Sequence, residues 1–314
     1  MRAIGLALLL VVAACSQPSP QTTSLSSPTP SPSPVAQCRL PIVWNVGTVP
    51  HHAFLSYPSG DVAEVDANGD VYDAQYQRWV PGTQELVSPD GSQYTYFSFS
   101  SSIPANSQVH VVDVVSGVDR IVYDGATSYW PIAFAGDGIY AMHAINLHQN
   151  AFEGLFRLDP ARGTVSSVPG SERLPQARWT LVSGGSAWGL TNQLGNQGIL
   201  NKVEQLDLAS GTATEWFQEQ QNVQLDPVGR DAQGRLYITD NYQLWRLDAP
   251  NVEERLLNPP PTAGQISIFI FASDPHGEWM GAYGGPWHYS DAEGARQLSV
   301  ATNHEVVVPA GPCM

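Results

Sequence analysis

From residue 38 onward, short runs of alternating apolar and polar residues are separated by glycine-containing turns, and no stretch keeps a helical period. Alternation with a period of two is typical of β-strands that bury one face. Turns that follow apolar runs recur along the chain, ending at Gly91, Gly138, Gly185, Gly234 and Gly277. A second series advances in step between them, ending at Gly117, Gly163, Gly211, Asn251 and Gly294.

The first series has spacings of 47, 47, 49 and 43 residues. A period in the forties with two tight turns per unit is typical of a four-stranded propeller blade. The second unit should place its strands near 84–88, 93–100, 108–115 and 118–123. A further, irregular unit is expected over 49–82. The sequence therefore predicts an all-β, six-bladed β-propeller over 38–314, with seven blades as the alternative count.

The first 37 residues differ sharply from the rest. An apolar run from Ile4 to Ala14 follows Arg2 and is too short to span a bilayer, which indicates a signal peptide over 1–14. The ending Val12-Ala13-Ala14-Cys15 resembles the bacterial lipobox, which implies a lipid on Cys15 and a location in the cell envelope, anchored to the outer face of the membrane. A plain secretory peptide is the alternative. Residues 15–37 are mostly Pro, Ser, Thr and Gln and predict an extended linker.

Two cysteines remain once Cys15 is assigned to the lipid. Cys38 opens the predicted propeller and Cys313 lies one residue from the end. Since an exported chain meets an oxidising compartment, we expect a disulfide between them that fastens the ends of the ring. Two free thiols are the alternative.

The chain is strongly acidic, with 14 basic and 29 acidic residues and a formal net charge of −15. Such a chain should repel nucleic acid and anionic headgroups, so a nucleic-acid partner is not expected. The acidity is also explained by solubility alone. We expect a monomer that contacts the membrane through its lipid.

Common catalytic and metal motifs are missing, including HExxH, CxxC pairs, GxSxG and a Walker-type glycine loop. The segment Asp66–Asp70 begins like a calcium loop, but the later ligand positions hold Val71 and Gln77. We therefore interpret Asn68-Gly69 as a hairpin turn. No cofactor is predicted, and a divalent metal is kept as an alternative.

The turns SPDG at 88–91 and LDLASG at 206–211 resemble those of six-bladed TolB, NHL-repeat and gluconolactonase-like propellers. The CRLP start at Cys38 and the export signal resemble a group of bacterial propeller lipoproteins. The gluconolactonase likeness implies Asp240 and Asn241 as metal ligands in the central tunnel, with a polar turn as the alternative. These likenesses concern the fold, which does not determine function.

The two turns within a unit are 26, 25 and 26 residues apart in units two to four, but 17 apart in units five and six. We attribute the extra length to long loops between the second and third strands, at SSSIPANS, INLHQNAFE and NQLGNQG. Such loops often carry binding sites. Ligand contacts are therefore expected near Trp130, His143, His148 and Asn192.

Two functions fit these features. The first is a non-catalytic binding module for a protein, peptide or glycan. The second is a metal-dependent hydrolase or lyase with its site in the tunnel. The sequence favours the first, because it provides no convergent set of metal ligands or catalytic groups.

Overall fold

The computed structural model divides the chain into two compact units, 1–35 and 36–314. It describes residues 37–46, 48–100, 106–146, 151–195, 198–221, 225–239, 243–257, 271–300 and 305–314, all in the second unit. The signal peptide, Cys15, nearly all of the linker, His148, Asp240 and Asn241 lie outside the described residues. What was predicted for them stays a prediction.

Between 129 and 297, the described chain forms four antiparallel sheets of four strands each, here numbered IV to VII. Sheet IV contains β9 (Tyr129–Ala135), β10 (Gly138–Asn146), β11 (Ala151–Asp159) and β12 (Thr164–Ser167). Sheet V contains β13 (Arg178–Ser183), β14 (Ser186–Gly195), β15 (Gly198–Asp207) and β16 (Ala213–Gln221). Sheet VI contains β17 (Asp226–Arg230), β18 (Leu236–Thr239), β19 (Leu244–Ala249) and β20 (Val252–Leu257). Sheet VII contains β21 (Phe271–Asp274), β22 (Gly277–Met280), β24 (Trp287–Ser290) and β25 (Gly294–Gln297).

The predicted turns lie between these strands. Three glycines of the second series, at 163, 211 and 294, have φ values of 69°, 69° and 71°, a conformation that favours glycine. The turn series therefore located the strands of these four sheets correctly.

Sheet III has three strands, β6 (Gln93–Phe99), β7 (Ser107–Asp113) and β8 (Asp119–Gly125). The prediction of a strand at 84–88 is wrong. Its place is taken by the 3₁₀ helix η1 (Gln84–Leu86), and only Val87 forms a bridge, to Tyr94. The turn that begins at Ser88 follows directly, so no length remains for a strand.

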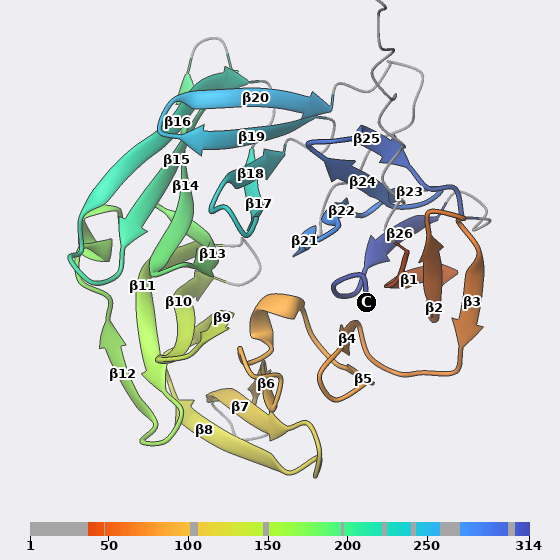
Figure 1. Cartoon of the computed structure of the whole chain (residues 1–314). Coiled ribbons are helices and arrows are strands. Elements are labelled where there is room, and N and C mark those ends of the chain that lie inside the picture. Colours follow the sequence, from red (N-terminus) through yellow and green to blue (C-terminus); the bar gives the residue numbers. More distant parts are fainter. Residues whose placement is uncertain are drawn as a thin grey trace, which may run out of the picture. The chain divides into compact units, whose positions relative to one another are not determined.

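The first strands of sheets III to VII contact one another in order, β6 with β9, β9 with β13, β13 with β17 and β17 with β21. Figure 1 shows these sheets side by side, with those strands at the inner ends. Buried apolar clusters lie between successive sheets, for example Val109 of sheet III with Ile139 of sheet IV. Sheets that pack face to face around a shared centre define a β-propeller.

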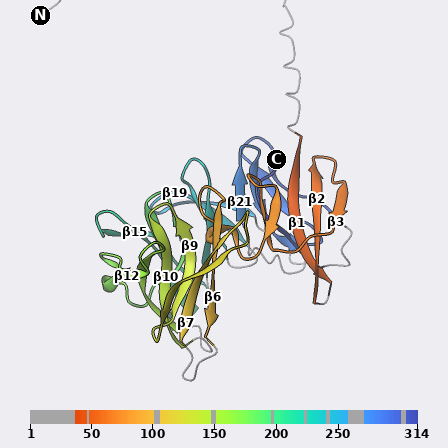
Figure 2. The same ribbon diagram turned by 90° about the horizontal axis from the view of Figure 1, so that it is seen from below.

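The two ends of the described chain meet in sheet I. Its strand order is β23 (Ala282–Tyr283), β26 (Val306–Pro309), β1 (Cys38–Val46), β2 (Val49–Tyr57) and β3 (Val62–Val65). The C-terminus lies beside β1 in two views at right angles (Figure 1, Figure 2). A disulfide joins Cys38 to Cys313, as the sequence predicted, with the Cα atoms 5.5 Å apart.

The segment 49–82 does not form one blade. β2 and β3 belong to sheet I, whereas β4 (Val71–Asp73) and β5 (Arg78–Val80) form a separate two-stranded sheet II. The hairpin predicted at Asn68-Gly69 is also wrong, because β3 and β4 do not pair. Gly69 instead approaches the Val80 backbone so closely that an added Cβ would lie 2.7 Å from it. Since the strands within 49–82 are divided between sheets I and II, the predicted count of six blades is not confirmed.

Most of the extra length of unit four is paired strand, which corrects the predicted loop. The residues of NQLGNQG that the structure describes, 192–195 and 198, continue β14 and β15, and Gly195 lies opposite Gly198. β10 and β11 are long in the same way, with nine residues each. Polar residues in these positions extend paired strands beyond the apolar core. Among the parts of the chain that the structure describes, no helix is long and apolar enough to cross a membrane.

Candidate functional site

Two cavities lie along the inner strands. The first, of about 470 Å³, is lined by the opening residues of β9, β13 and β17, and we call it the strand-start cavity. The second, of about 740 Å³, is lined by the turns that end β9 and β13, and we call it the turn-side cavity. Glu85 of η1 lines both. The 3₁₀ helix that replaced the predicted strand therefore brings a carboxylate to both cavities.

The strand-start cavity has an aromatic edge. Trp130 opens β9, lines the cavity and is 41% exposed. Its ring lies 5.1 Å from that of Phe97 and 6.4 Å from that of Phe152, and Phe97 contacts Phe99 at 4.9 Å. We call these four residues the aromatic shelf. Trp130 and Phe99 are exposed, whereas Phe97 and Phe152 are half-buried. Neighbouring exposed aromatic rings are suited to contact a ligand or partner.

Charged groups line the same cavity. Arg178 at the start of β13 forms an ion pair with Asp226 at the start of β17. Burial lowers the pKa of Arg178. Among the contacts described for this chain, Glu85 has no ion-pair or hydrogen-bond partner, so the three charged groups sum to one negative charge. This cavity can therefore attract a cation next to an aromatic ring.

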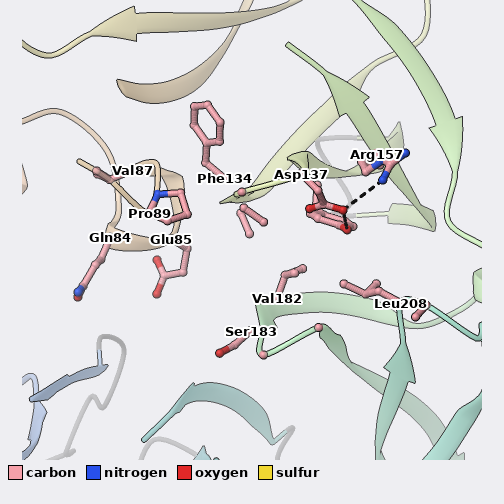
Figure 3. Close-up of a pocket in the computed structure, with 17 residues that line it drawn as sticks. Gln84, Glu85, Val87, Pro89, Phe134, Asp137, Arg157, Val182, Ser183 and Leu208 are labelled. Atoms are coloured by element: carbon pink, nitrogen blue, oxygen red, sulfur yellow. Dashed lines mark hydrogen bonds and ion pairs between the residues drawn. The ribbon is translucent and has the colours of Figure 1, made fainter. Parts of the chain in front are cut away.

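In the turn-side cavity, the carboxylate of Asp137 already has hydrogen-bond partners within the protein. Asp137 accepts hydrogen bonds from the Tyr140 hydroxyl at 2.9 Å and from Arg157 at 3.1 Å (Figure 3). Burial, together with the bond to Asp137, raises the pKa of Tyr140 to about 12. In the same view, Glu85 projects from η1, across the cavity from Asp137.

Of the predicted contact residues that the structure describes, Trp130 lines the strand-start cavity. His143 lies within sheet IV, where it bonds Glu153 at 3.0 Å and contacts the rings of Tyr129 and Phe156. Asn192 is exposed on β14, opposite Asn201. Trp130, His143 and Asn192 thus belong to three separate environments. Glu85 was missed because its segment was assigned to a strand.

A third polar region lies between sheets VI and VII. Arg235 bonds both the buried Asp231 and Asp291, and Arg246 bonds Asp291 at 2.6 Å. Glu278 lines an adjoining cavity of about 190 Å³, is 5% exposed, and has one carboxylate oxygen without a hydrogen-bond partner. Burial, and then the negative charge of Asp231, raise the pKa of Glu278 to about 8. Glu278 therefore holds a proton at neutral pH.

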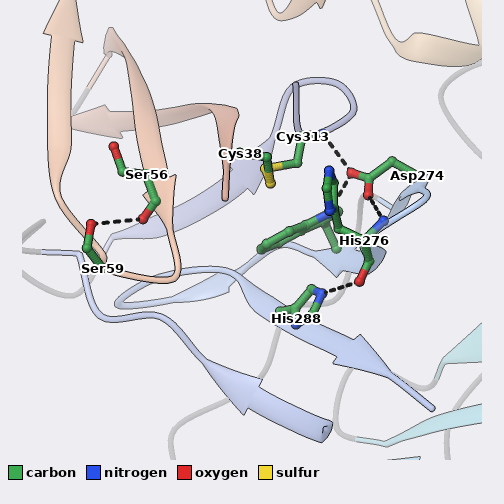
Figure 4. Close-up of a disulfide and its surroundings, with 8 residues drawn as sticks. Cys38, Ser56, Ser59, Asp274, His276, His288 and Cys313 are labelled. Atoms are coloured by element: carbon green, nitrogen blue, oxygen red, sulfur yellow. Dashed lines mark hydrogen bonds between the residues drawn. A yellow bond between two sulfur atoms is a disulfide. The ribbon is translucent and has the colours of Figure 1, made fainter. Parts of the chain in front are cut away.

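The surroundings of the disulfide are also polar. Asp274 accepts hydrogen bonds from the backbone N–H of Cys313 at 2.6 Å, from that of His276 at 2.7 Å and from the Trp279 indole at 2.8 Å (Figure 4). The His288 Nε2 donates to the His276 carbonyl at 3.0 Å. These histidines are held by structural bonds. Within the described ranges, no group of three or more His, Cys, Asp or Glu is placed to hold a metal ion.

No family model matches the chain, and no curated protein matches it. Solved structures with a similar fold include TolB from Acinetobacter baumannii, at 13% identity and a TM-score of 0.47, covering 87% of this chain and 63% of TolB. A putative 6-phosphogluconolactonase from Bacteroides uniformis has 12% identity and a TM-score of 0.47, with 87% and 98% covered. The propeller domain of the Trilobed protease from Pyrococcus furiosus has 10% identity and a TM-score of 0.46, with 84% and 86% covered. The chain resembles TolB-like and lactonase-like propellers in fold, as the turn phrases indicated, and identities this low carry nothing about function.

Proposed function

We propose that the chain is a lipid-anchored, extracytoplasmic binding module whose strand-start cavity takes a basic side chain of a peptide or protein. The observation that carries the proposal is the cavity itself, which combines the exposed Trp130 ring with the unpaired Glu85 carboxylate. A cation over a tryptophan face gains about 0.5–2 kcal/mol, depending on how far it is desolvated. A carboxylate in the same cavity adds a charge-assisted hydrogen bond.

The charge balance favours a basic peptide over a neutral glycan. Arg178 and Asp226 neutralise each other, so the carboxylate of Glu85 is available to pair with a positively charged group of a ligand. The net charge of −15 would also draw cationic partners toward the molecule. The aromatic shelf adds apolar area for residues next to the basic one.

The anchor belongs to the same proposal. The apolar run ends in Ala13-Ala14-Cys15, and the Cys38–Cys313 disulfide supports an oxidising compartment outside the cytoplasm. A lipid on Cys15 would hold the propeller at the outer face of the membrane. The linker would then let its cavities face soluble or envelope partners.

A peptide array tests the ligand. Each peptide is synthesised with arginine and again with citrulline, which keeps the shape but removes the charge, and is probed with the purified full chain. We expect arginine peptides to bind at least about tenfold more tightly, which corresponds to one hydrogen bond to a charged group. Glu85→Gln should reduce that difference, and Trp130→Ala should weaken binding of both forms, the arginine form more strongly.

Glu172→Gln is the matched control, because Glu172 is exposed in the 3₁₀ helix η3 (Ser171–Arg173) and lines neither cavity. It should bind like the unaltered chain. Equal binding of arginine and citrulline peptides would contradict the role of Glu85. Retention of neutral oligosaccharides on a parallel array, with no peptide retained, would replace the peptide by a glycan.

A further inference from the structure

A serine, a histidine and an aspartate lie in hydrogen-bonded series across the three strands of sheet III. The Ser98 Oγ on β6 is 2.9 Å from the His110 Nε2 on β7. The His110 Nδ1 is 3.0 Å from one Asp119 carboxylate oxygen at the start of β8 and 3.2 Å from the other. This is the order and spacing in which a base activates a serine and a carboxylate orients the base.

The alternation of side chains along sheet III explains why these three polar groups share a face. Odd positions of β6 and β7 face sheet IV, as the Phe97–Trp130 contact and the packing of Val109 show. Even positions therefore face sheet II, where Tyr94 packs against Val71. Sheet II consists of two strands of three residues each, so it covers little of that face, and the polar side chains there compensate for burial by hydrogen-bonding to one another.

The hydrogen bonds fix the histidine tautomer. An ionised carboxylate only accepts, so Asp119 requires a proton on His110 Nδ1 and leaves Nε2 as the acceptor for the Ser98 hydroxyl. The competing acceptor for that hydroxyl, the Gln108 Oε1, is farther away at 3.5 Å. Asp119 is partly desolvated, which favours its neutral form, but hydrogen bonds from Tyr96 and His110 outweigh this and lower its pKa.

Tyr96 holds the pair in place. Its ring stacks on the His110 imidazole with centroids 4.3 Å apart, and its hydroxyl donates to the second Asp119 oxygen at 2.6 Å. His110 is 8% exposed, whereas Ser98 is only partly buried and Asp119 is open to solvent. The base is therefore protected and oriented, and the nucleophile can be reached.

We propose that Ser98, His110 and Asp119 form an acyl-transfer site that hydrolyses small carboxylic esters through an acyl-Ser98 intermediate. This activity is separate from the binding role proposed above. The Ser98 oxygen bonds to the ester carbonyl carbon while its proton passes to His110 Nε2. The bond from that carbon to the leaving oxygen then breaks, and His110 returns the proton to the leaving alcohol.

Water completes the cycle. It attacks the acyl carbon and gives a proton to His110 Nε2, the bond to the Ser98 oxygen breaks, and that oxygen regains the proton as the carboxylic acid leaves. The backbone offers a donor for the carbonyl oxygen beside Ser98. The Ser100 N–H bonds the Asn106 carbonyl, so even residues of β6 pair with β7 and the Phe99 N–H points to the open edge of the sheet.

The test uses a fluorophosphonate, which phosphonylates activated serines, followed by digestion of the full chain and mass spectrometry. We expect one adduct on Ser98 and slow hydrolysis of p-nitrophenyl acetate. Ser98→Ala should remove both. His110→Gln should slow labelling by at least about 100-fold, the lower end of the usual contribution of a general base.

Two further measurements separate chemistry from structure. Free imidazole should restore labelling of His110→Ala, which a purely structural histidine would not permit, and thermal unfolding should verify that each variant is folded. Ser166→Ala is the control, because Ser166 is an exposed strand serine on β12 whose hydroxyl donates to the backbone carbonyl of Arg157. No adduct on Ser98 in the folded chain, or equal labelling of folded His110→Gln, would overturn the proposal.

Discussion

Glu278 should make the stability of the propeller depend on pH, in a direction opposite to that of most carboxylates. Burial raises its pKa from 4.5 to about 8, and Asp231 and Asp274 add to this while Ser273 and Arg235 act against it. The folded chain therefore keeps a proton that the unfolded chain releases near pH 4.5. The stabilisation that this proton represents is complete below pH 4.5 and is lost progressively as the pH rises toward 8.

The size of the effect follows from the two pKa values. Each pH unit between them removes about 1.4 kcal/mol, and allowing for incomplete titration near the limits gives about 2–3 kcal/mol between pH 5.5 and 7.5. Glu278→Gln keeps the shape but does not titrate. The free energy of unfolding of the variant, minus that of the unaltered chain, should therefore rise by this amount over the same interval.

Urea unfolding of both chains at pH 5.5, 6.5 and 7.5 measures the difference. Titration of other groups is common to both chains and largely cancels in the subtraction. Glu172→Gln, an exposed glutamate away from sheets VI and VII, should show no such trend. A difference between Glu278→Gln and the unaltered chain that does not change with pH would mean that Glu278 is ionised in the folded state, and the argument from burial would fail.

Two further predictions concern the cysteines. Palmitate should label the full chain in its host but not Cys15→Ser, and equal labelling would end the assignment of the lipid. Joint replacement of Cys38 and Cys313 by serine should lower the free energy of unfolding in urea by about 2–5 kcal/mol, since the bond closes 275 residues. If the double replacement leaves the free energy of unfolding unchanged, the disulfide does not stabilise the fold, and the pairing of β1 with β26 is sufficient to hold the ends together.

The sequence predicted what depends on local pattern. Alternation and turn glycines located the strands of sheets IV to VII, because these signals lie within each hairpin. The segment 49–82 was misassigned, because the pairing of β2 with β1 and the separation of β4 and β5 from other sheets depend on contacts between segments far apart in the sequence. The described part of NQLGNQG, 192–195 and 198, was predicted as a loop, because paired strands beyond the core carry no apolar signal.

The candidate sites were partly within reach of the sequence. Ser98, His110 and Asp119 all lie in strands predicted at 93–100, 108–115 and 118–123, so the sequence places them on neighbouring strands. It does not predict which residues lie opposite one another, because the register depends on the irregularity between Val109 and His110. The position of Glu85 in the two cavities could not be predicted, because it depends on a 3₁₀ helix where the sequence predicted a strand.

The two proposed sites share strand β6 but should act independently. Phe97, in the aromatic shelf, faces sheet IV, whereas Ser98 faces sheet II, so consecutive side chains serve opposite faces of one strand. Ser98→Ala removes no atom from the shelf and should leave the affinity for an arginine peptide unchanged. Trp130→Ala should likewise leave fluorophosphonate labelling of Ser98 unchanged, because Trp130 lies on the far side of the strand. If each substitution impairs both functions in folded protein, the two faces are coupled through β6, and the assignment of two separate sites is wrong.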